Sequence, residues 1–317
     1  MCTALTLPTA RGALFGRTLD LDQHFGERVA LTPRRFDFRF RLTDAPHGGA
    51  HHPLLGMAAV VDGYPLYADA MNDAGLCMAG LRFAGYAHYD SHPTEGGINL
   101  TPWEVIPFVL AYHTTVDEAE TTLQRVKIVD HPYSANLPNT PLHWMIADRS
   151  GEALVVEATE AGVQIHRNPV GVLTNAPPFL CQLAHWRSYA HMTAKHPADA
   201  AGKGTASAFP LGVGAVGLPG DYSSPSRFVR AAFLRREAGR AIRDAANPVA
   251  RFFSLLGAVV PPFGAVLTPE GKPHHTLYTS CADTAEGRYY YATEASLGVK
   301  WVSFGDRGEA IDGERVM

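Results

Sequence analysis

Between Ala13 and Phe83 the apolar residues fall into short β-prone runs, which are separated by Gly, Asp and Asn. The runs read ALFGRTLDL, RVALTPRRF, LGMAAVVDGY, LYADAMN and LCMAGLRF. Short runs of this composition between turn-forming residues are typical of strands. Their close succession predicts consecutive hairpins of an antiparallel sheet.

The remainder of the chain alternates between helical and strand-like patterns. Thr101-Pro102-Trp103-Glu104 predicts a helix start, with threonine at the N-cap and proline at the first helical position, and VDEAETTLQRV predicts a second helix. Residues 142–175 return to strand-like runs and lead into a short helical stretch, CQLAHWRSYAHM. Helical spacing then predicts a second helical pair in SPSRFVRAAFLRREAGR and NPVARFFSLLGAVV, and TLYTSCAD and RYYYATEASLGVKWVSFG predict closing strands.

This order of strands, helices, strands, helices and strands predicts one α+β domain built in layers over residues 1–317, because neither half contains a complete pattern. The alternative is a domain boundary in the Gly-, Ala- and Pro-rich loop from Lys195 to Gly220. That loop is not linker-like throughout, and the terminal strands need neighbours, so the single domain is favoured.

Composition excludes several classes of protein. Hydrophobic residues make up 46% of the chain and charged residues 18%, which is typical of a globular protein with a large core. The 27 basic and 31 acidic residues give a net charge of −4, so neither nucleic acid nor a membrane is expected as a partner. The N-terminus lacks the pattern of a secretory signal, and the four scattered cysteines form no CxxC pair. We therefore expect a cytoplasmic protein.

Two motifs that suggest a cofactor or a metal lack the required context. Residues 212–217 match GxGxxG, but the flanking sequence supplies neither a preceding strand nor a helix that opens from the glycines, so a tight loop is expected. The histidine pairs His51-His52 and His274-His275 have no acid or cysteine at metal-ligand spacing, and solvated loops are expected for both. We expect no cofactor and no metal.

Cys2 directly follows Met1. We expect Met1 to be removed, autocatalytically or by an aminopeptidase that accepts a small second side chain, so that a thiol and a free α-amino group share one residue. Their ordinary pKa values are about 8.5 and about 7.7–8.0, so the amine can accept the thiol proton near neutral pH. This pair is the device of N-terminal nucleophile amidases. On position alone, a cysteine without a function is the alternative.

The segment Phe15-Gly16-Arg17-Thr18-Leu19-Asp20 offers charges for this chemistry. Strand alternation places Arg17 and Leu19 on one face and Asp20 at the end of the strand. A cation near the sulfur would lower the thiol pKa, and a carboxylate would orient the terminal ammonium. The alternative from this segment alone is an ordinary surface ion pair.

Taken together, these segments resemble the choloylglycine hydrolase family, which comprises bile salt hydrolases and penicillin V acylases. The resemblance runs in order through MCTALT, FGRTLDLD, VALTPRRF, MNDAGLCMAGLRFAGYA, LTNAPPF, LPGDYSSPSRFVRAAF and YTSCAD with YYYAT, over nearly the whole chain. It implies a four-layer αββα N-terminal nucleophile hydrolase fold, in which two stacked antiparallel sheets are flanked by helical pairs. It also implies a homotetramer that needs no cofactor.

The resemblance assigns roles to single residues. The nucleophile corresponds to Cys2, the arginine on the thiol side to Arg17, and the aspartate on the amine side to Asp20. The oxyanion asparagine corresponds to Asn175 in LTNAP, and a second active-site arginine to Arg227 in SPSRF. The alternatives are a turn-forming asparagine before Ala-Pro-Pro and an arginine on a helix surface.

Arg82 departs from the family pattern, in which GLRF is usually GLNF among bile salt hydrolases, while some penicillin V acylases carry an aromatic residue there. The family uses the main-chain N–H at this position in the oxyanion hole, and a side-chain change leaves that donor in place. The Arg82 guanidinium is expected either to pair with an anionic glycine or taurine group or to block part of the pocket.

The resemblance implies a small-molecule amide substrate with an apolar acyl group. The apolar candidates for the acyl pocket are Leu21, Phe25, Val61 and Leu137. Conjugated bile salts are the first substrate class, because SPSRF and YTSC resemble that branch most closely. Penicillin V comes second, and other N-acyl amides such as acyl homoserine lactones third.

Two rivals from other classes remain open at this point. A catalytically silent binding protein would keep the fold without turnover. A cysteine peptidase would instead use an internal pair of cysteine and histidine, with Cys77 or Cys181 as the nucleophile.

Overall fold

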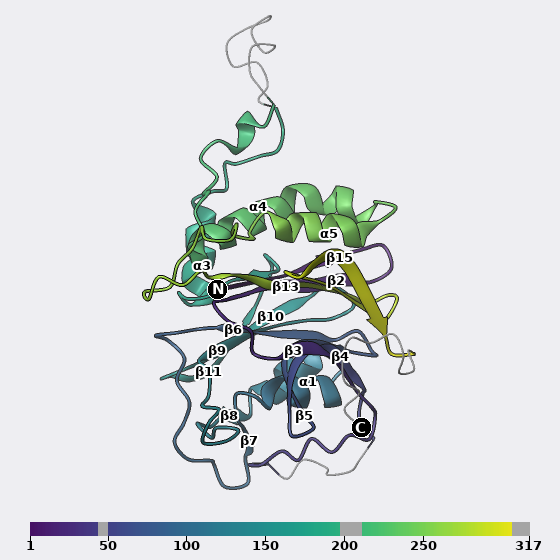
Figure 1. Ribbon diagram of the computed structural model, residues 1–317, viewed down its shortest axis with the longest axis vertical. Helices are drawn as coiled ribbons and strands as arrows, with labels where there is room; N and C mark the ends of the chain where they lie inside the picture. Colours follow the sequence, from purple (N-terminus) through teal and green to yellow (C-terminus); the bar gives the residue numbers. More distant parts are fainter. Residues whose placement is uncertain (44–49, 197–210, 306–317) are drawn as a thin grey trace, which may run out of the picture.

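Two antiparallel sheets lie face to face in the computed structural model, which describes residues 1–43, 50–196 and 211–305 (Figure 1). The six-stranded sheet has the order β12 (Val172–Leu173), β1 (Cys2–Pro8), β2 (Ala13–Leu21), β13 (His275–Asp283), β14 (Arg288–Thr293) and β15 (Ser296–Ser303). The seven-stranded sheet has the order β11 (Gly162–Arg167), β10 (Ala153–Thr159), β9 (Leu142–Ala147), β6 (Cys77–Arg82), β5 (Tyr64–Asn72), β4 (Leu54–Val61) and β3 (Glu27–Thr32). Two short parallel strands, β7 (Ile98–Leu100) and β8 (Val126–Ile128), pair separately.

Helices cover the outer faces of the two sheets. Figure 1 shows α4 (Ser224–Arg243) and α5 (Pro248–Gly257) above the six-stranded sheet, with α3 (Phe179–Arg187) beside them, and α1 (Val105–Tyr112) below the seven-stranded sheet. The helix α2 (Val116–Leu123) contacts β10 and β11 of the latter. The expected four-layer αββα arrangement, with its two helical pairs, is confirmed.

The first helix begins later than its sequence predicts. Its first residue is Val105, and Glu104 rather than Thr101 occupies the N-cap. The buried Glu104 carboxylate accepts hydrogen bonds from the main-chain N–H groups of Thr101, at 2.9 Å, and Arg41, at 2.8 Å. These bonds close a turn over residues 101–104, so the threonine is held outside the helix.

Each sheet divides its side chains between two apolar layers. In β6, Ala79 and Leu81 face the layer between the sheets, whereas Met78 faces the layer beneath α1. This alternation follows from the two-residue period of a strand that is buried on both faces. The same apolar cluster contains Cys2, so the strand that carries the candidate nucleophile packs with one face against β6 of the seven-stranded sheet and with the other against α4.

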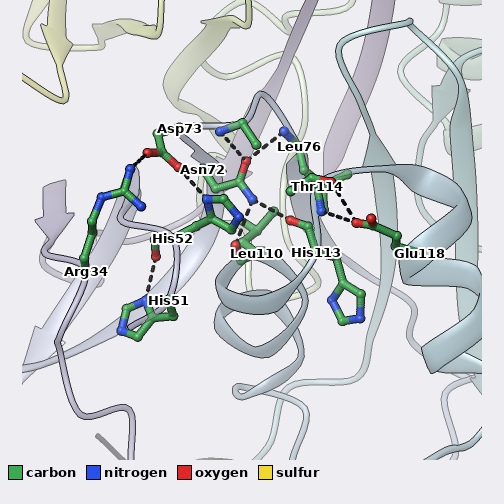
Figure 2. Close-up of polar contacts among 11 residues, drawn as sticks. Arg34, His51, His52, Asn72, Asp73, Leu76, Leu110, His113, Thr114 and Glu118 are labelled. Carbon is green, nitrogen blue, oxygen red and sulfur yellow. Dashed lines mark hydrogen bonds and ion pairs between the residues drawn. The ribbon is translucent and has the colours of Figure 1, made fainter. Parts of the chain in front are cut away.

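Asn72 fastens the turn between β5 and β6 to the end of α1 (Figure 2). Its Nδ2 donates to the carbonyl oxygens of Leu110, at 2.8 Å, and His113, at 2.7 Å. Its Oδ1 accepts from the N–H groups of Ala74, at 3.1 Å, and Leu76, at 2.9 Å. The side chain is fully buried, so all four bonds replace bonds to water.

The GxGxxG segment forms a loop, as expected. Gly212 and Gly217 have φ angles of 87° and 91°, and between them lies only a short 3₁₀ turn, η2 (Val213–Ala215). The alternative domain boundary lies largely outside the described residues, because positions 197–210 are among those that the structure does not describe. Within the described part of the chain, no helix is long and apolar enough to cross a bilayer.

The expectation of solvated loops is wrong for one residue of each histidine pair, His51 and His275. His51 is buried, and its Nε2 lies 2.8 Å from the carbonyl oxygen of Phe36. His275 is the first residue of β13. His274 lies beside the N-terminus and is described with the site below.

Candidate active site

Cys2 is the first residue of β1 and is buried, with 5% of its surface exposed. It pairs with Leu19 of β2 in the six-stranded sheet. Its side chain contributes to the wall of a cavity of about 500 Å³ between the two sheets and the β8–β9 connection. A thiol placed in this way is rigidly held and still reaches a space that a substrate can enter.

Arg17 joins the two sheets next to Cys2. It extends from β2, is fully buried, and donates through Nη1 to the carbonyl oxygens of Gly80, at 2.6 Å, and Ala68, at 3.1 Å, in the seven-stranded sheet. Its Nη2 is buried and has no hydrogen-bond partner among the described residues. The alternative of an ordinary surface ion pair is therefore wrong.

The surrounding charges favour the ionised form of the sulfur. Burial raises the pKa of the Cys2 thiol, but the positive charges of Arg17, the N-terminal ammonium and Arg227 outweigh that effect. The net result is a thiol pKa below its ordinary value. A lowered pKa is what a nucleophilic cysteine requires near neutral pH.

Asp20 lies on the amine side of Cys2. Its carboxyl group is buried: Oδ1 accepts from the Thr276 hydroxyl at 2.5 Å, and Oδ2 has no partner among the described residues. The main chain of Asp20 holds Met1 in the sheet, since its N–H donates to the Met1 oxygen at 2.8 Å and its oxygen accepts from the Met1 ammonium at 2.7 Å.

His274 is a neighbour of the terminus that sequence reasoning missed. Its Nε2 lies 3.1 Å from the Met1 nitrogen, and its Nδ1 is buried without a partner in the described structure. Burial and, next, the terminal ammonium lower the pKa of His274 to about 4. No local signal marks this residue; its place follows from the pairing of β13 with β2.

Asn175 links the nucleophile to the other sheet. Its Oδ1 accepts from the Cys2 N–H at 2.7 Å and from Arg227 Nη2 at 2.8 Å. Its Nδ2 donates one N–H to the carbonyl oxygen of Arg82 at 2.8 Å, which leaves one N–H for a further acceptor. Asn175 does precede a turn with a cis Ala176-Pro177 bond, but its side chain is committed to the site.

Arg227 is buried beneath β1 and does not lie on a helix surface. From α4, its Nη1 donates to the Cys2 oxygen at 2.5 Å and to Thr3 Oγ1 at 2.7 Å. The alternative of an arginine on a helix surface is therefore wrong. Together with the bond to Asn175, these contacts fix the nucleophile strand and the amide group relative to each other.

Further residues that the sequence did not identify hold the main chain at Asn175. Its N–H donates to Ser224 Oγ at 2.9 Å, and its oxygen accepts from Gln182 Nε2 at 2.5 Å. The preceding carbonyl, at Thr174, lies 2.8 Å from Nε2 of the buried His143. The only sequence signal for such residues is a polar side chain at a position with apolar neighbours.

The cavity brings together seven of the ten residues expected in the site. Its wall contains Cys2 and Arg17, and also Arg82 and the four acyl-pocket candidates Leu21, Phe25, Val61 and Leu137. Asp20, Asn175 and Arg227 are not part of that wall, and each contacts Met1 or Cys2. Apolar and aromatic lining residues that were not anticipated are Leu19, Ala59, Leu66, Tyr67, Pro102, Trp103, Ile106, Tyr133, Pro138 and Leu142.

The internal cysteines are poorly placed for a peptidase. Cys77 and Cys281 lie fully buried, and burial raises the pKa of both thiols. Cys181 is exposed on α3. The geometry therefore favours Cys2 over these residues as the nucleophile.

Comparison with known proteins agrees with this geometry. The family model "Linear amide C-N hydrolases, choloylglycine hydrolase family" matches residues 2–313. The bile salt hydrolase/transferase of Lactiplantibacillus plantarum is 39% identical over 305 residues, which cover 96% of this chain and 92% of that protein. The penicillin V acylase of Pectobacterium atrosepticum is 27% identical over 267 residues, with coverage of 78% and 62%.

Among solved structures, a variant of the conjugated bile acid hydrolase from Clostridium perfringens superimposes with a TM-score of 0.89 at 34% identity. The match covers 99% of this chain and 97% of that one. The similarity therefore includes every strand and helix that carries a site residue.

Proposed function

The chain belongs to the choloylglycine hydrolase family of linear amide C–N hydrolases, and from this premise we propose that it hydrolyses the amide bond of glycine- or taurine-conjugated bile salts, with Cys2 as its N-terminal nucleophile. The observation that carries the proposal is the position of Cys2: a thiol of lowered pKa on the wall of a largely apolar cavity, with Asn175 bonded to its nitrogen.

The reaction begins once Met1 is removed and the Cys2 nitrogen is a free amine. That amine takes the thiol proton, and the sulfur attacks the amide carbon of the substrate. Arg17 stabilises the thiolate, and Asp20 orients the ammonium that forms.

The negative charge then moves to the carbonyl oxygen of the substrate. The free N–H of Asn175 Nδ2 and the main-chain N–H of Arg82 stabilise this oxyanion, because they are fixed before the charge develops. The ammonium of Cys2 donates its proton to the leaving amine as the C–N bond breaks. Water, deprotonated by the same amine, hydrolyses the thioester, so no step requires a cofactor.

The cavity supports an acyl group that is both broad and apolar. The wall that contains Cys2 also contains the apolar side chains of Leu21, Phe25, Val61 and Leu137. A bile acid presents a wide hydrocarbon skeleton that such a surface removes from water. Relatives that are called bile salt hydrolases match this chain at higher identity and coverage than the penicillin V acylase does.

Penicillin V is the second candidate substrate, because its aromatic acyl group would contact the aromatic part of the same cavity, at Phe25 and Trp103. Other N-acyl amides, such as acyl homoserine lactones, come third. All three classes would react through the same thioester.

A side-by-side assay of glycocholate, taurocholate and penicillin V tests the proposal. We expect bile salt conjugates to be hydrolysed with the highest kcat/KM and Cys2→Ala to abolish turnover, whereas Cys181→Ala, on the exposed face of α3, retains it. Intact mass should show that Met1 is absent from the active protein. Binding of bile salts without any release of glycine or taurine would identify a silent binding protein instead.

We also propose that residues 1–317 form one domain, that the protein is a homotetramer and that it resides in the cytoplasm. Free cysteines at positions 2, 77, 181 and 281 suit a reducing compartment. Light scattering after size-exclusion chromatography would test the tetramer, which predicts about four times the mass of one 34.2 kDa chain.

A further inference from the structure

The active-site cavity has one cation without a partner. Two arginines line it, Arg17 and Arg82. Arg17 is fully buried and committed to the carbonyl oxygens of Ala68 and Gly80. The Arg82 side chain is exposed, and within the described part of the chain its guanidinium has no recorded hydrogen bond or ion pair.

Arg82 is also fixed close to the reacting groups by its main chain. It is the last residue of β6, opposite Leu142 of β9, and its carbonyl oxygen accepts Asn175 Nδ2 at 2.8 Å. The other atom of that amide, Oδ1, accepts the Cys2 N–H at 2.7 Å. Arg82 is therefore separated from the Cys2 nitrogen by a single side-chain amide.

The leaving amine must come to the same place. In the proposed mechanism the Cys2 nitrogen donates its proton to that amine, so the two nitrogens approach to about 3 Å. The carboxylate of glycine lies one carbon beyond its nitrogen, and the sulfonate of taurine lies two carbons beyond. An anion at that distance falls within the reach of a long, unbonded arginine side chain that starts from the neighbouring main chain.

We propose that the Arg82 guanidinium binds the anionic group of the leaving amine and so selects conjugates of small amino or aminosulfonic acids. The planar fork of a guanidinium matches a carboxylate or sulfonate with two parallel hydrogen bonds. Among the described residues that line the cavity, Asp22 is the only acidic one, and Arg82 is the arginine whose guanidinium has no recorded partner there. The inference rests on the proposed amide hydrolysis and adds the part of the substrate that Arg82 recognises.

The test compares two substrates that differ in charge alone. Glycocholate and the neutral cholyl glycinamide share their acyl group and nearly their size. For Arg82→Gln we expect kcat/KM for glycocholate to fall about tenfold more than kcat/KM for cholyl glycinamide, mainly through KM. Arg82→Lys should restore part of the preference, because it keeps the charge but not the fork.

Charge reversal makes the test independent of a general loss of activity. Arg82→Glu should prefer a cationic conjugate, the aminoethyl amide of cholate, over glycocholate. Arg35→Gln is the matched control, since the exposed Arg35 lines an adjoining cavity and not the active-site cavity. It should leave the ratio of the two substrates as it is in the wild type.

The outcomes separate the two proposals. If the wild type hydrolyses none of these conjugates, the proposed function fails. If the wild type hydrolyses them but Arg82→Gln changes kcat/KM for charged and neutral substrates by the same factor, the function stands and the assignment of Arg82 is overturned. An unchanged preference in Arg82→Glu would overturn it as well.

Discussion

The replacement Asn175→Asp separates the two tasks of this side chain, since aspartate has nearly the same shape. Both hydrogen bonds to Oδ1 survive: the one from the Cys2 nitrogen at 2.7 Å and the one from Arg227 Nη2 at 2.8 Å. The two N–H groups of Nδ2 are lost. One of them bonds to the Arg82 oxygen, and the other is the proposed oxyanion donor.

The size of the effect follows from this count. Loss of one preorganised oxyanion donor costs roughly 10²–10³ in kcat, which corresponds to about 2.7–4 kcal/mol. A carboxylate oxygen in its place repels the oxyanion, so about 10² is the lower limit. Stability should change little, because the new ion pair with Arg227 offsets the lost hydrogen bond to the Arg82 oxygen; we expect Tm to shift by less than about 3 °C.

Release of glycine from glycocholate measures kcat, and circular dichroism measures Tm. Asn247→Asp is the matched control: Asn247 caps α5 through a 3.1 Å bond from the Ala250 N–H, and an aspartate caps equally well. The control should keep wild-type kcat. A value of kcat for Asn175→Asp within tenfold of the wild type, with Tm preserved, would refute the role of Asn175 as oxyanion donor.

Three further predictions concern the thiol, the turn at Asn72 and His274. At pH 7 iodoacetamide should alkylate Cys2 faster than Cys77, because nearby cations lower the pKa of Cys2 while burial raises that of Cys77; equal rates in peptide mass maps would contradict this. Asn72→Ala should lower the free energy of unfolding in urea by about 3 kcal/mol, since four buried bonds lose their partner; a loss below about 1 kcal/mol would show that the turn does not need them. The folded pKa of His274, about 4, lies below its ordinary 6.5, so the unfolded chain binds the proton more tightly and stability falls as pH decreases from 6.5 to 4. His274→Asn should reduce that loss, and urea titrations at pH 7 and pH 4.5 would reveal it.

The amino-acid sequence predicts the elements of the fold because most of them are set by local patterns. The helix start at Val116 is an example: Thr115 and Glu118 form a complete capping box within four residues. The start of α1 is different. Glu104 binds the distant N–H of Arg41, a contact that no window around the helix contains.

The site residues also divide into those that a local pattern predicts and those whose place depends on distant partners. Cys2 is recognisable from its position in the chain. Arg17 and Asp20 are recognisable from their spacing along one strand. Burial is not recognisable in this way, because Arg17 finds its acceptors in the opposite sheet and Arg227 finds its acceptors in β1. A polar residue with such partners has the same local sequence as one on a surface, and only the packing of two sheets and a helix distinguishes them.

The buried charges around Cys2 bear on the proton transfer of the proposed mechanism. Arg17 and Arg227 donate hydrogen bonds to neutral oxygens, and their positive charges lower the pKa of the Cys2 thiol, whereas the charge of Asp20 raises it. Ionisation of the sulfur gives both arginines an anionic partner.

Transfer of the proton to the neighbouring amine keeps the total charge constant and changes only where the charges lie. In the proposed mechanism the negative charge lies on the sulfur, where Arg17 lowers the thiol pKa, and the positive charge on the amine, which Asp20 is proposed to orient. Both residues come from β2, the strand that pairs with β1 along its whole length. One hairpin therefore carries the candidate nucleophile and both charged residues that the proposed mechanism assigns to its proton transfer.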